Sequence, residues 1–248
     1  MEAFFAGGAV EALLVAAVFA LAGLVKGVTG MGLPTVSVSL LALWMTPAAA
    51  AAPLVMPSLV TNLAQCRGPA LRRLASRLWP MWAALAVSLV VAPDLSAVSP
   101  IDTRIALGAV LVVYGLVGLR RPELPPVPPG ERWIGALVGA ATGVVTASTA
   151  VFVLPMVPYL QALRLDRDGT VQALGLSFMV ATLALAVRIG RDETHAVLTG
   201  MSVVALAAAL AGLALGTAAR ARIGAATFQR ALFAMFVLLG AVNLWRGA

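Results

Sequence analysis

Long apolar runs, separated by short interruptions, constrain this chain more than any other feature. Gly, Pro and Arg residues divide it into ten runs: 9–27, 33–45, 48–65, 79–96, 101–119, 133–147, 150–163, 169–188, 196–218 and 226–245. A helix needs about 20 apolar residues to cross the hydrocarbon core of a bilayer. The runs 33–45 and 150–163 fall short of that length, so we expect broken or re-entrant helices there.

The composition excludes a soluble domain. Of the 248 residues, 61% are hydrophobic and 11% are charged, whereas a soluble domain carries about 25% charged residues. We therefore predict an all-α integral membrane protein. No basic run is interleaved with aromatic residues, so the net charge of +7 indicates membrane topology rather than nucleic-acid binding. With one cysteine, one histidine and dispersed carboxylates, we expect no disulfide, metal, cofactor or enzymatic activity.

A proline-rich stretch divides the chain in two. Five prolines lie within positions 122–129, and such a segment favours an extended connection over a helix. We predict a first transmembrane repeat over 1–119, a cytoplasmic linker over 120–132 and a second transmembrane repeat over 133–248. A shift of 116 positions aligns four identical pairs: Leu21 with Leu137, Gly23 with Gly139, Gly27 with Gly143, and Val28 with Val144.

The distribution of positive charge predicts the orientation. If all ten segments cross, all but four of the 17 Lys and Arg residues lie on one side; the four are Arg104, Arg188, Arg191 and Arg246. The split becomes nearly even if the two short segments return to the same side. The positive-inside rule favours the first arrangement, in an inner membrane with both termini periplasmic. Five crossings per half then give two repeats in inverted topology, with broken or short helices at the midplane.

The first repeat contains a glycine-rich interruption over 23–35, with Gly30 and Gly32 followed by Pro34. Glycine and proline destabilise a continuous helix, and Pro34 suits the first turn of a new one. Irregular backbone inside a bilayer survives where protein or a cavity covers it. The N-terminus of the new helix would present backbone N–H groups to an anion. We therefore place substrate-binding residues at Thr29, Gly30, Met31, Gly32 and Pro34.

The second repeat has a corresponding stretch over 139–149, in which hydroxyl residues replace glycines. We expect a second break at Thr146, Ser148 and Thr149, with hydroxyls that donate to the same ligand. The four-residue spacing of Gly23 with Gly27, and the same spacing in 135–143, has another interpretation. Small residues at this spacing allow two helices to pack closely, so these glycines fit packing as well as binding.

Polar residues follow each short segment. Ser58, Thr61, Asn62 and Gln65 are spaced to share one helix face, and Gln172 and Ser177 lie in the other half. We list Asn62, Gln65, Gln172 and Ser177 as substrate-binding candidates, and hydrogen bonding between helices remains the alternative.

Lys26 lies at the end of the first segment, beside the glycine-rich interruption. It either attracts an anion to the entrance or extends to the lipid headgroups.

These motifs resemble the sulfite exporter TauE/SafE family of bacterial membrane permeases. The resemblance covers nearly the whole chain and is most specific at 26–34, 57–62 and 153–161. It implies a duplicated multi-pass transporter for small organosulfur or sulfur oxyanions, often exported. The family's glycine-rich break matches Gly27, Gly30 and Gly32, whereas Thr146, Ser148 and Thr149 replace the glycines that the pattern expects in the second half.

We therefore expect a multi-pass exporter of a small anion such as sulfite or an organosulfonate, working by alternating access between the repeats. Its expected partners are the anion and the lipid bilayer, with no nucleic acid, and a homo-oligomer is left open. A membrane scaffold or lipid-binding protein without transport is the alternative. That alternative predicts tightly packed breaks with no chamber between Gly30 and Thr146.

Overall fold

The computed structural model describes residues 8–93, 102–120, 125–128, 132–192, 199–220, 222 and 225–247. All regular secondary structure in these ranges is helical, which confirms the all-α prediction. The helices are α2 (Gly8–Thr29), α3 (Leu33–Leu41), α4 (Pro47–Ala51), α5 (Val55–Cys66), α6 (Leu71–Val91), α8 (Thr103–Arg120), α9 (Arg132–Thr149), α10 (Met156–Ala162), α11 (Arg167–Asp192), α12 (Gly200–Ala219) and α13 (Ala225–Gly247).

Six helices in the described ranges are long and apolar enough to cross a membrane: α2, α6, α8, α11, α12 and α13. They correspond to the predicted segments 9–27, 79–96, 101–119, 169–188, 196–218 and 226–245. The start predicted for the fourth segment was wrong by two turns, because α6 already begins at Leu71. The chain is therefore a multi-pass membrane protein.

The segments predicted to be short contain short helices. Helix α3 has nine residues and α10 has seven; at a rise of about 1.5 Å per residue, neither spans a bilayer. The prediction of one helix over 48–65 was wrong. Here α4 ends at Ala51 and α5 begins at Val55, with Pro53 in the turn between them, where its missing N–H costs no helical hydrogen bond.

The long helices pack in close pairs: α2 with α12, α6 with α9, and α8 with α13. Glycines make the close approach possible. A Cβ on Gly23 would overlap the backbone of Ala209 in α12, and a Cβ on Gly139 would overlap the backbone of Met81 in α6. The packing interpretation of the four-spaced glycines is therefore confirmed.

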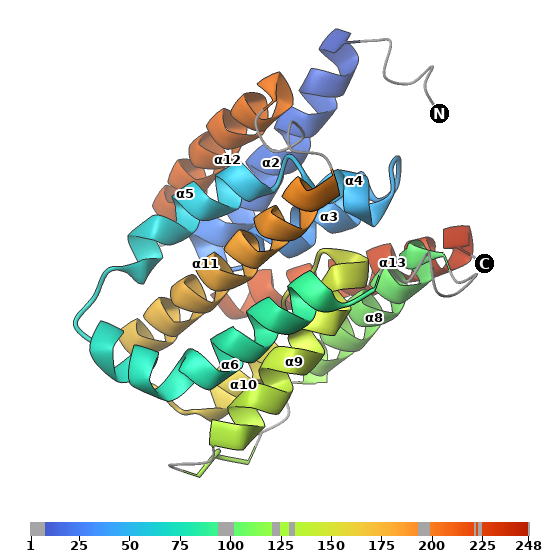
Figure 1. Ribbon diagram of the computed structural model, residues 1–248. Helices are drawn as coiled ribbons and strands as arrows, with labels where there is room; N and C mark the ends of the chain where they lie inside the picture. Colours follow the sequence, from blue (N-terminus) through green and yellow to red (C-terminus); the bar gives the residue numbers. More distant parts are fainter. Residues whose placement is uncertain are drawn as a thin grey trace.

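Helices α5 and α11 pack against each other between the α2–α12 pair and the α6–α9 pair (Figure 1). Helix α5 also contacts α12, and α11 contacts α6. Exchanging α2, α5, α6 and α8 with α9, α11, α12 and α13 maps each of these packing pairs onto another pair or onto itself. The arrangement is consistent with two repeats related by a two-fold axis.

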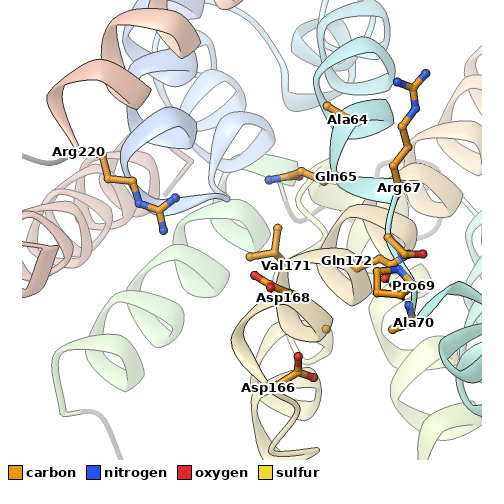
Figure 2. Close-up of a pocket in the computed structure, with 12 residues that line it drawn as sticks. Ala64, Gln65, Arg67, Pro69, Ala70, Asp166, Asp168, Val171, Gln172 and Arg220 are labelled. Atoms are coloured by element: carbon orange, nitrogen blue, oxygen red, sulfur yellow. Dashed lines mark hydrogen bonds between the residues drawn. The ribbon is translucent and has the colours of Figure 1, made fainter.

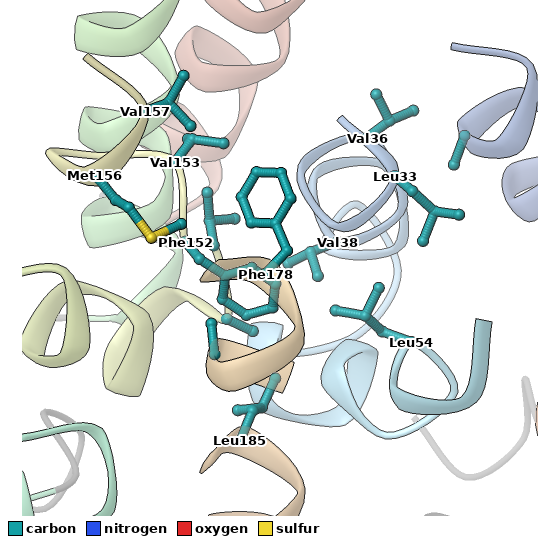
Figure 3. Packing of buried hydrophobic residues seen from close by; sticks show 14 of the residues in the cluster. Leu33, Val36, Val38, Leu54, Phe152, Val153, Met156, Val157, Phe178 and Leu185 are labelled. Atoms are coloured by element: carbon teal, nitrogen blue, oxygen red, sulfur yellow. The ribbon is translucent and has the colours of Figure 1, made fainter. Parts of the chain in front are cut away.

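The centre of the molecule is apolar (Figure 3). The Phe152 and Phe178 rings lie 6.2 Å apart, centroid to centroid, and both are buried among residues of α3 and of the segment before α10. Labelled neighbours from these two elements include Val36, Val38 and Val153. Apolar side chains from α3, α11 and the segment before α10 therefore pack together next to the second break.

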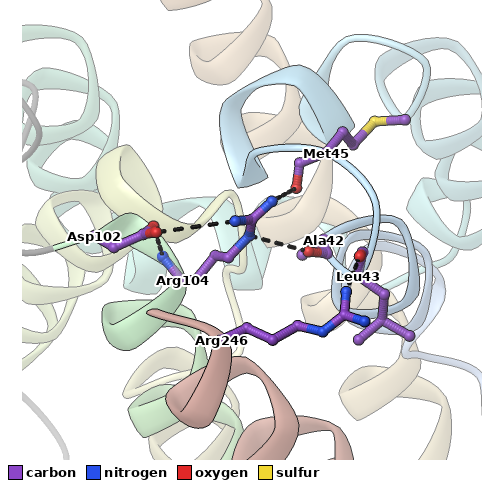
Figure 4. A network of polar contacts seen from close by, with 6 residues as sticks. All are labelled: Ala42, Leu43, Met45, Asp102, Arg104 and Arg246. Carbon is purple, nitrogen blue, oxygen red and sulfur yellow. Dashed lines mark hydrogen bonds and ion pairs between the residues drawn. The ribbon is translucent and has the colours of Figure 1, made fainter. Parts of the chain in front are cut away.

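Two arginines hold the C-terminal end of α3 (Figure 4). The Arg104 side chain, from α8, donates to the carbonyls of Ala42 and Met45 at 3.3 and 3.4 Å. Arg246, from α13, donates to the carbonyl of Leu43. Positive charge at this end complements the helix dipole and satisfies carbonyls that lack a helical partner.

Candidate functional site

The first break lies between α2 and α3. Helix α2 ends at Thr29, and Gly30 and Gly32 adopt φ values of +82° and +99°, a region that L side chains seldom adopt. Gly32 is the N-cap of α3 and Pro34 lies in its first turn. The predicted interruption and the predicted position of Pro34 in the first turn of a new helix are confirmed. Because Gly32 has no side chain, the first turn of α3 has no side-chain cap.

The Lys26 side chain turns into the protein. It is 2% exposed, and its ammonium donates to Thr61 Oγ1 at 3.0 Å and to Asn62 Oδ1. Both partners are neutral, and the ion pairs seen in the described residues, Arg73–Asp166 and Asp102–Arg104, do not include Lys26. The interpretation that Lys26 extends to the headgroups is therefore wrong. A buried ammonium without a negative partner is unfavourable, so this environment suits an anion.

One face of α5 lines the break. Thr61 and Asn62 contact Lys26, and one turn later Gln65 Nε2 donates to the Gly30 carbonyl at 2.7 Å. Ser58 lies one turn before Asn62, and its side chain is fully buried. The prediction that these residues share a helix face is confirmed by the contacts of Thr61, Asn62 and Gln65.

Several buried polar atoms near the break lack a hydrogen-bond partner in the described protein. They are Thr35 Oγ1, Ser58 Oγ, Asn62 Nδ2 and Gln65 Oε1. The first two carry hydroxyl protons and the third carries amide protons, so three of the four atoms can donate. Asn62 Nδ2 belongs to the amide whose oxygen accepts from Lys26, so this donor is next to the ammonium. Unsatisfied buried donors are costly, which makes this concentration notable.

A pocket of about 560 Å³ reaches the same face of α5 from outside (Figure 2). Gln65 lines it on one side, and Arg220, at the end of α12, extends toward the same space from the opposite side; Arg67 is turned away. Asp168 lies between them, at the start of α11. Gln65 therefore belongs both to the pocket and to the break.

The second break differs from the prediction. Helix α9 continues through Thr146 and Thr149, and the interruption follows over 150–155, so the predicted position was wrong by about one turn. The hydroxyls of Thr146 and Thr149 donate to the carbonyls of Thr142 and Val145 at 2.6 and 2.7 Å. Thr149 also accepts from the Val151 N–H at 3.2 Å. Carbonyls of α9 itself accept from these hydroxyls, so the helix continues through both threonines.

Ser148 and Ser177 have other surroundings. Ser148 borders a pocket of about 580 Å³ between α6 and α9 whose other lining residues are almost all apolar, Val87, Val91 and Val144 among them. Ser177 is buried and accepts from Trp82 Nε1 of α6 at 2.9 Å. Ser177 therefore has the hydrogen bond between helices that was its alternative role.

Gln172 binds backbone. Its Nε2 donates to the carbonyls of Cys66 and Gly68 at 3.0 Å each, and its Oε1 accepts from Ala70 N–H at 3.2 Å. One amide thus holds the turn between α5 and α6 against α11. The substrate-binding role listed for Gln172 stays a prediction, as does that of Ser177.

Met31 is also placed at the first break. The Tyr114 hydroxyl, from α8, lies 3.8 Å from the Met31 sulfur, and Thr29 Oγ1 lies 2.8 Å from the Met31 carbonyl. The structure thus gathers Lys26, Thr29, Gly30, Asn62 and Gln65 into one connected group. Sequence reasoning missed Ser58 and Thr35 as candidates, although Ser58 shares the α5 face already recognised.

The described residues contain no group of three or more His, Cys, Asp or Glu side chains that could hold a metal ion. The arrangement can instead bind negative charge, through one ammonium and neutral donors.

Apolar helices around a buried polar group define a multi-pass membrane protein. Comparison with protein families finds a match over residues 15–244 to the family described as Sulfite exporter TauE/SafE. The match covers nearly the whole chain, so the chain belongs to the TauE/SafE family, and the resemblance noted from its motifs is confirmed. Comparisons with curated proteins and with solved structures found no match. Family and helices together support a membrane transporter.

Proposed function

We propose that the chain is an inner-membrane exporter of a small anion such as sulfite or an organosulfonate, and that the first break holds the anion. The buried Lys26 ammonium carries this proposal, because its protein partners, Thr61 and Asn62, are neutral oxygens. An anion would supply the missing charge and accept from Asn62 Nδ2 and Ser58 Oγ, which lack partners in the described protein. The first turn of α3 adds a partial positive charge.

The route to this site begins at the pocket beside Gln65. Arg220 is the basic side chain that extends into the pocket, whose lining also includes Arg67, Asp166 and Asp168. Gln65 donates to the Gly30 carbonyl at the inner end of the pocket. Breaking that hydrogen bond would open the way from the pocket to Lys26, so we assign Gln65 to the inner gate and Lys26 to binding rather than entry.

Alternating access follows from the arrangement of the two halves. Exchanging the helices of one half with those of the other maps each packing pair onto another pair or onto itself. This symmetry is expected for inverted repeats that rock about a site near the midplane. The positive-inside rule places the pocket, with Arg67 and Arg220, on the cytoplasmic side. Of the four arginines on the other side, Arg104, Arg188 and Arg246 donate to backbone carbonyls. These contacts give the three arginines a structural role where they lie.

A membrane scaffold without transport is the second candidate. The apolar packing of Phe152 against Phe178 favours it, because both rings are fully buried and leave no polar surface at their own position. The two candidates differ in flux. A transporter moves the anion across a sealed membrane, whereas a scaffold does not.

Flux of ³⁵S-labelled sulfite from loaded proteoliposomes tests the proposal, with unlabelled methanesulfonate and acetate as competitors. We expect saturable flux above that of protein-free liposomes. Labelling of Cys66, the single cysteine and the residue after Gln65, provides a second readout, and we expect bound anion to slow it. Absence of flux for every sulfur oxyanion and carboxylate, with a correctly folded protein, would overturn the proposal and favour the scaffold.

A further inference from the structure

We infer that the first-break site is built for an anion of a single negative charge, such as a sulfonate or hydrogen sulfite, and discriminates against divalent anions. This inference rests on the proposed function and specifies the substrate class of the same site. It follows from the count of charges around Lys26, which is separate from the evidence that an anion binds at all.

The site offers at most one full positive charge, that of the Lys26 ammonium. The groups that contact Lys26 are the Thr61 hydroxyl and the Asn62 amide, and the other residues on that face of α5, Ser58 and Gln65, are also neutral. The nearest basic residues of the pocket lie at its exposed side: Arg220 is exposed, and the Arg67 side chain points away. The N-terminus of α3 adds a fraction of a charge, roughly half a unit.

Charge balance then decides which anion fits. A monoanion beside Lys26 forms a neutral pair, and the remaining donors are neutral groups suited to its oxygens. A dianion leaves about one negative charge without a counterion in a buried site. The penalty for an uncompensated buried charge amounts to several powers of ten in affinity before relaxation, and the partial charge of α3 recovers some of it. We expect divalent anions to bind about 100-fold more weakly than matched monoanions.

The unpartnered atoms support the same class. Ser58 Oγ and Asn62 Nδ2 can each donate to one oxygen, and Thr35 Oγ1 adds a third donor in the first turn of α3. Neutral donors stabilise an oxyanion through hydrogen bonds without adding charge. A site for a dianion would need a second Lys or Arg among them.

Binding of a matched pair of anions to the full chain in nanodiscs provides the test. Methanesulfonate carries one charge and methanedisulfonate carries two, with the same sulfonate chemistry. We expect methanesulfonate to bind about 100-fold more tightly, as measured by its protection of Cys66 from a thiol reagent. Equal or tighter binding of the disulfonate would overturn this inference and leave the proposed function intact. Failure of every anion to bind would overturn the proposed function itself.

Sulfite supplies an internal comparison, because its second ionisation occurs near neutral pH and converts the monoanion to the dianion. As pH rises through neutrality, the apparent affinity for sulfite should fall relative to that for methanesulfonate, whose charge stays constant. Methanesulfonate, measured at the same pH, shows how far any change in the protein's own ionisation lowers the affinity for a monoanion. A constant ratio would contradict the inference.

A variant with a second cation completes the test. Gln65→Lys places an ammonium beside the Gly30 carbonyl, where the wild-type amide donates at 2.7 Å. We expect this change to lower the ratio of the methanesulfonate affinity to the methanedisulfonate affinity by at least about tenfold. An unchanged ratio in a folded Q65K protein would count against the charge argument, and the wild-type ratio alone decides if Q65K does not fold.

Discussion

At the first break α2 ends with Thr29, and at the second α9 ends with Thr149. In each case the threonine oxygen lies 3.2 Å from the backbone nitrogen two residues later, on Met31 and Val151 respectively. The residue after each threonine has a positive φ, +82° at Gly30 and +55° at Ala150. The backbone therefore leaves α2 and α9 in the same way.

The side chains around the two breaks differ. Lys26 approaches the first break from the preceding turn of α2, and buried donors surround it without partners. The position one turn before the second break is Thr146, whose hydroxyl is satisfied by its own helix. Val151 and Phe152 then follow, both fully buried. The two helix interruptions are thus similar, and only the first has a basic side chain beside it. This difference teaches that backbone symmetry does not require a symmetric binding site.

The largest expected effect comes from removing that charge. Lys26→Met keeps a long unbranched side chain and deletes the ammonium. We expect sulfite flux in proteoliposomes to fall about 100-fold or more, because the anion loses its counterion. The apparent Tm at one fixed heating rate should not fall, since burying an ammonium among neutral partners is itself costly.

Thr146→Val is the matched control, because it changes the position one turn before the other break. A similar loss of sulfite flux in both variants would show that the two breaks are functionally equivalent, and would contradict the difference that we propose between them.

The second prediction places a competing negative charge in the first break. Asn62→Asp is nearly isosteric and puts a carboxylate where Asn62 Oδ1 accepts from Lys26. An internal ion pair would then occupy the ammonium, so we expect anion binding to weaken at least about tenfold.

Protection of Cys66 from thiol reagents by methanesulfonate measures this loss, and the apparent Tm shows whether the ion pair forms. Unchanged binding in N62D would place the anion away from Lys26. Ser76→Asp, on the exposed part of α6, controls for added negative charge.

The third prediction concerns the backbone that the breaks share. Gly30→Ala introduces a Cβ into open space, 3.9 Å from Gln65 Nε2, so steric clash is small and the positive φ dominates. The variant should lose about 1–2 kcal/mol of stability. Ala150→Gly removes the same strain at the second break, and its apparent Tm should stay level or rise, because the entropic cost of glycine offsets part of the gain.

Thermal unfolding of the two variants under identical detergent conditions checks the sign. A larger loss for Ala150→Gly than for Gly30→Ala would show that the positive φ values do not govern these positions.

The smallest effect is expected from the threonine hydroxyls. Thr149→Val removes the hydrogen bonds with Val145 and Val151, and hydroxyls in membrane helices contribute about 0.6 kcal/mol each. We expect a fall of a degree or two in apparent Tm, roughly, with sulfite flux within about twofold of wild type.

Thr29→Val makes the equivalent change at the first break, next to the proposed site. In this variant we expect a loss of sulfite flux larger than the loss of stability explains. If Thr149→Val reduced flux as much as Thr29→Val, the second break would have to be included in the binding site.

Much of the fold could be predicted because its signals are local. Gly30, Gly32 and Pro34 mark the first break within five residues, and helix periodicity alone indicated the shared face of Asn62 and Gln65. The six long apolar helices follow from composition. The second break was misplaced because no glycine marks it, and Ala150 adopts its positive φ through tertiary context.

The site could be predicted only in part, because its decisive contacts join distant segments. Lys26 at the end of an apolar run has the same local sequence whether it faces headgroups or the interior. Its partner Thr61 lies 35 residues away. Gln172 similarly reaches backbone more than 100 residues away, at Cys66 and Gly68. The sequence identified these residues because they are polar within apolar segments. It did not show whether each side chain binds a ligand or another part of the chain.

The contacts of Arg104 and Arg246 with the C-terminal end of α3 also have a mechanical consequence. Arg104 comes from α8 in the first half and Arg246 from α13 in the second, so the far tip of α3 is anchored to both halves at once. Because its C-terminal end is held, α3 can move mainly at its N-terminal end, which begins at Gly32. If the halves rock as we propose, these two contacts would hold the tip of α3 while its other end, close to Lys26, is displaced.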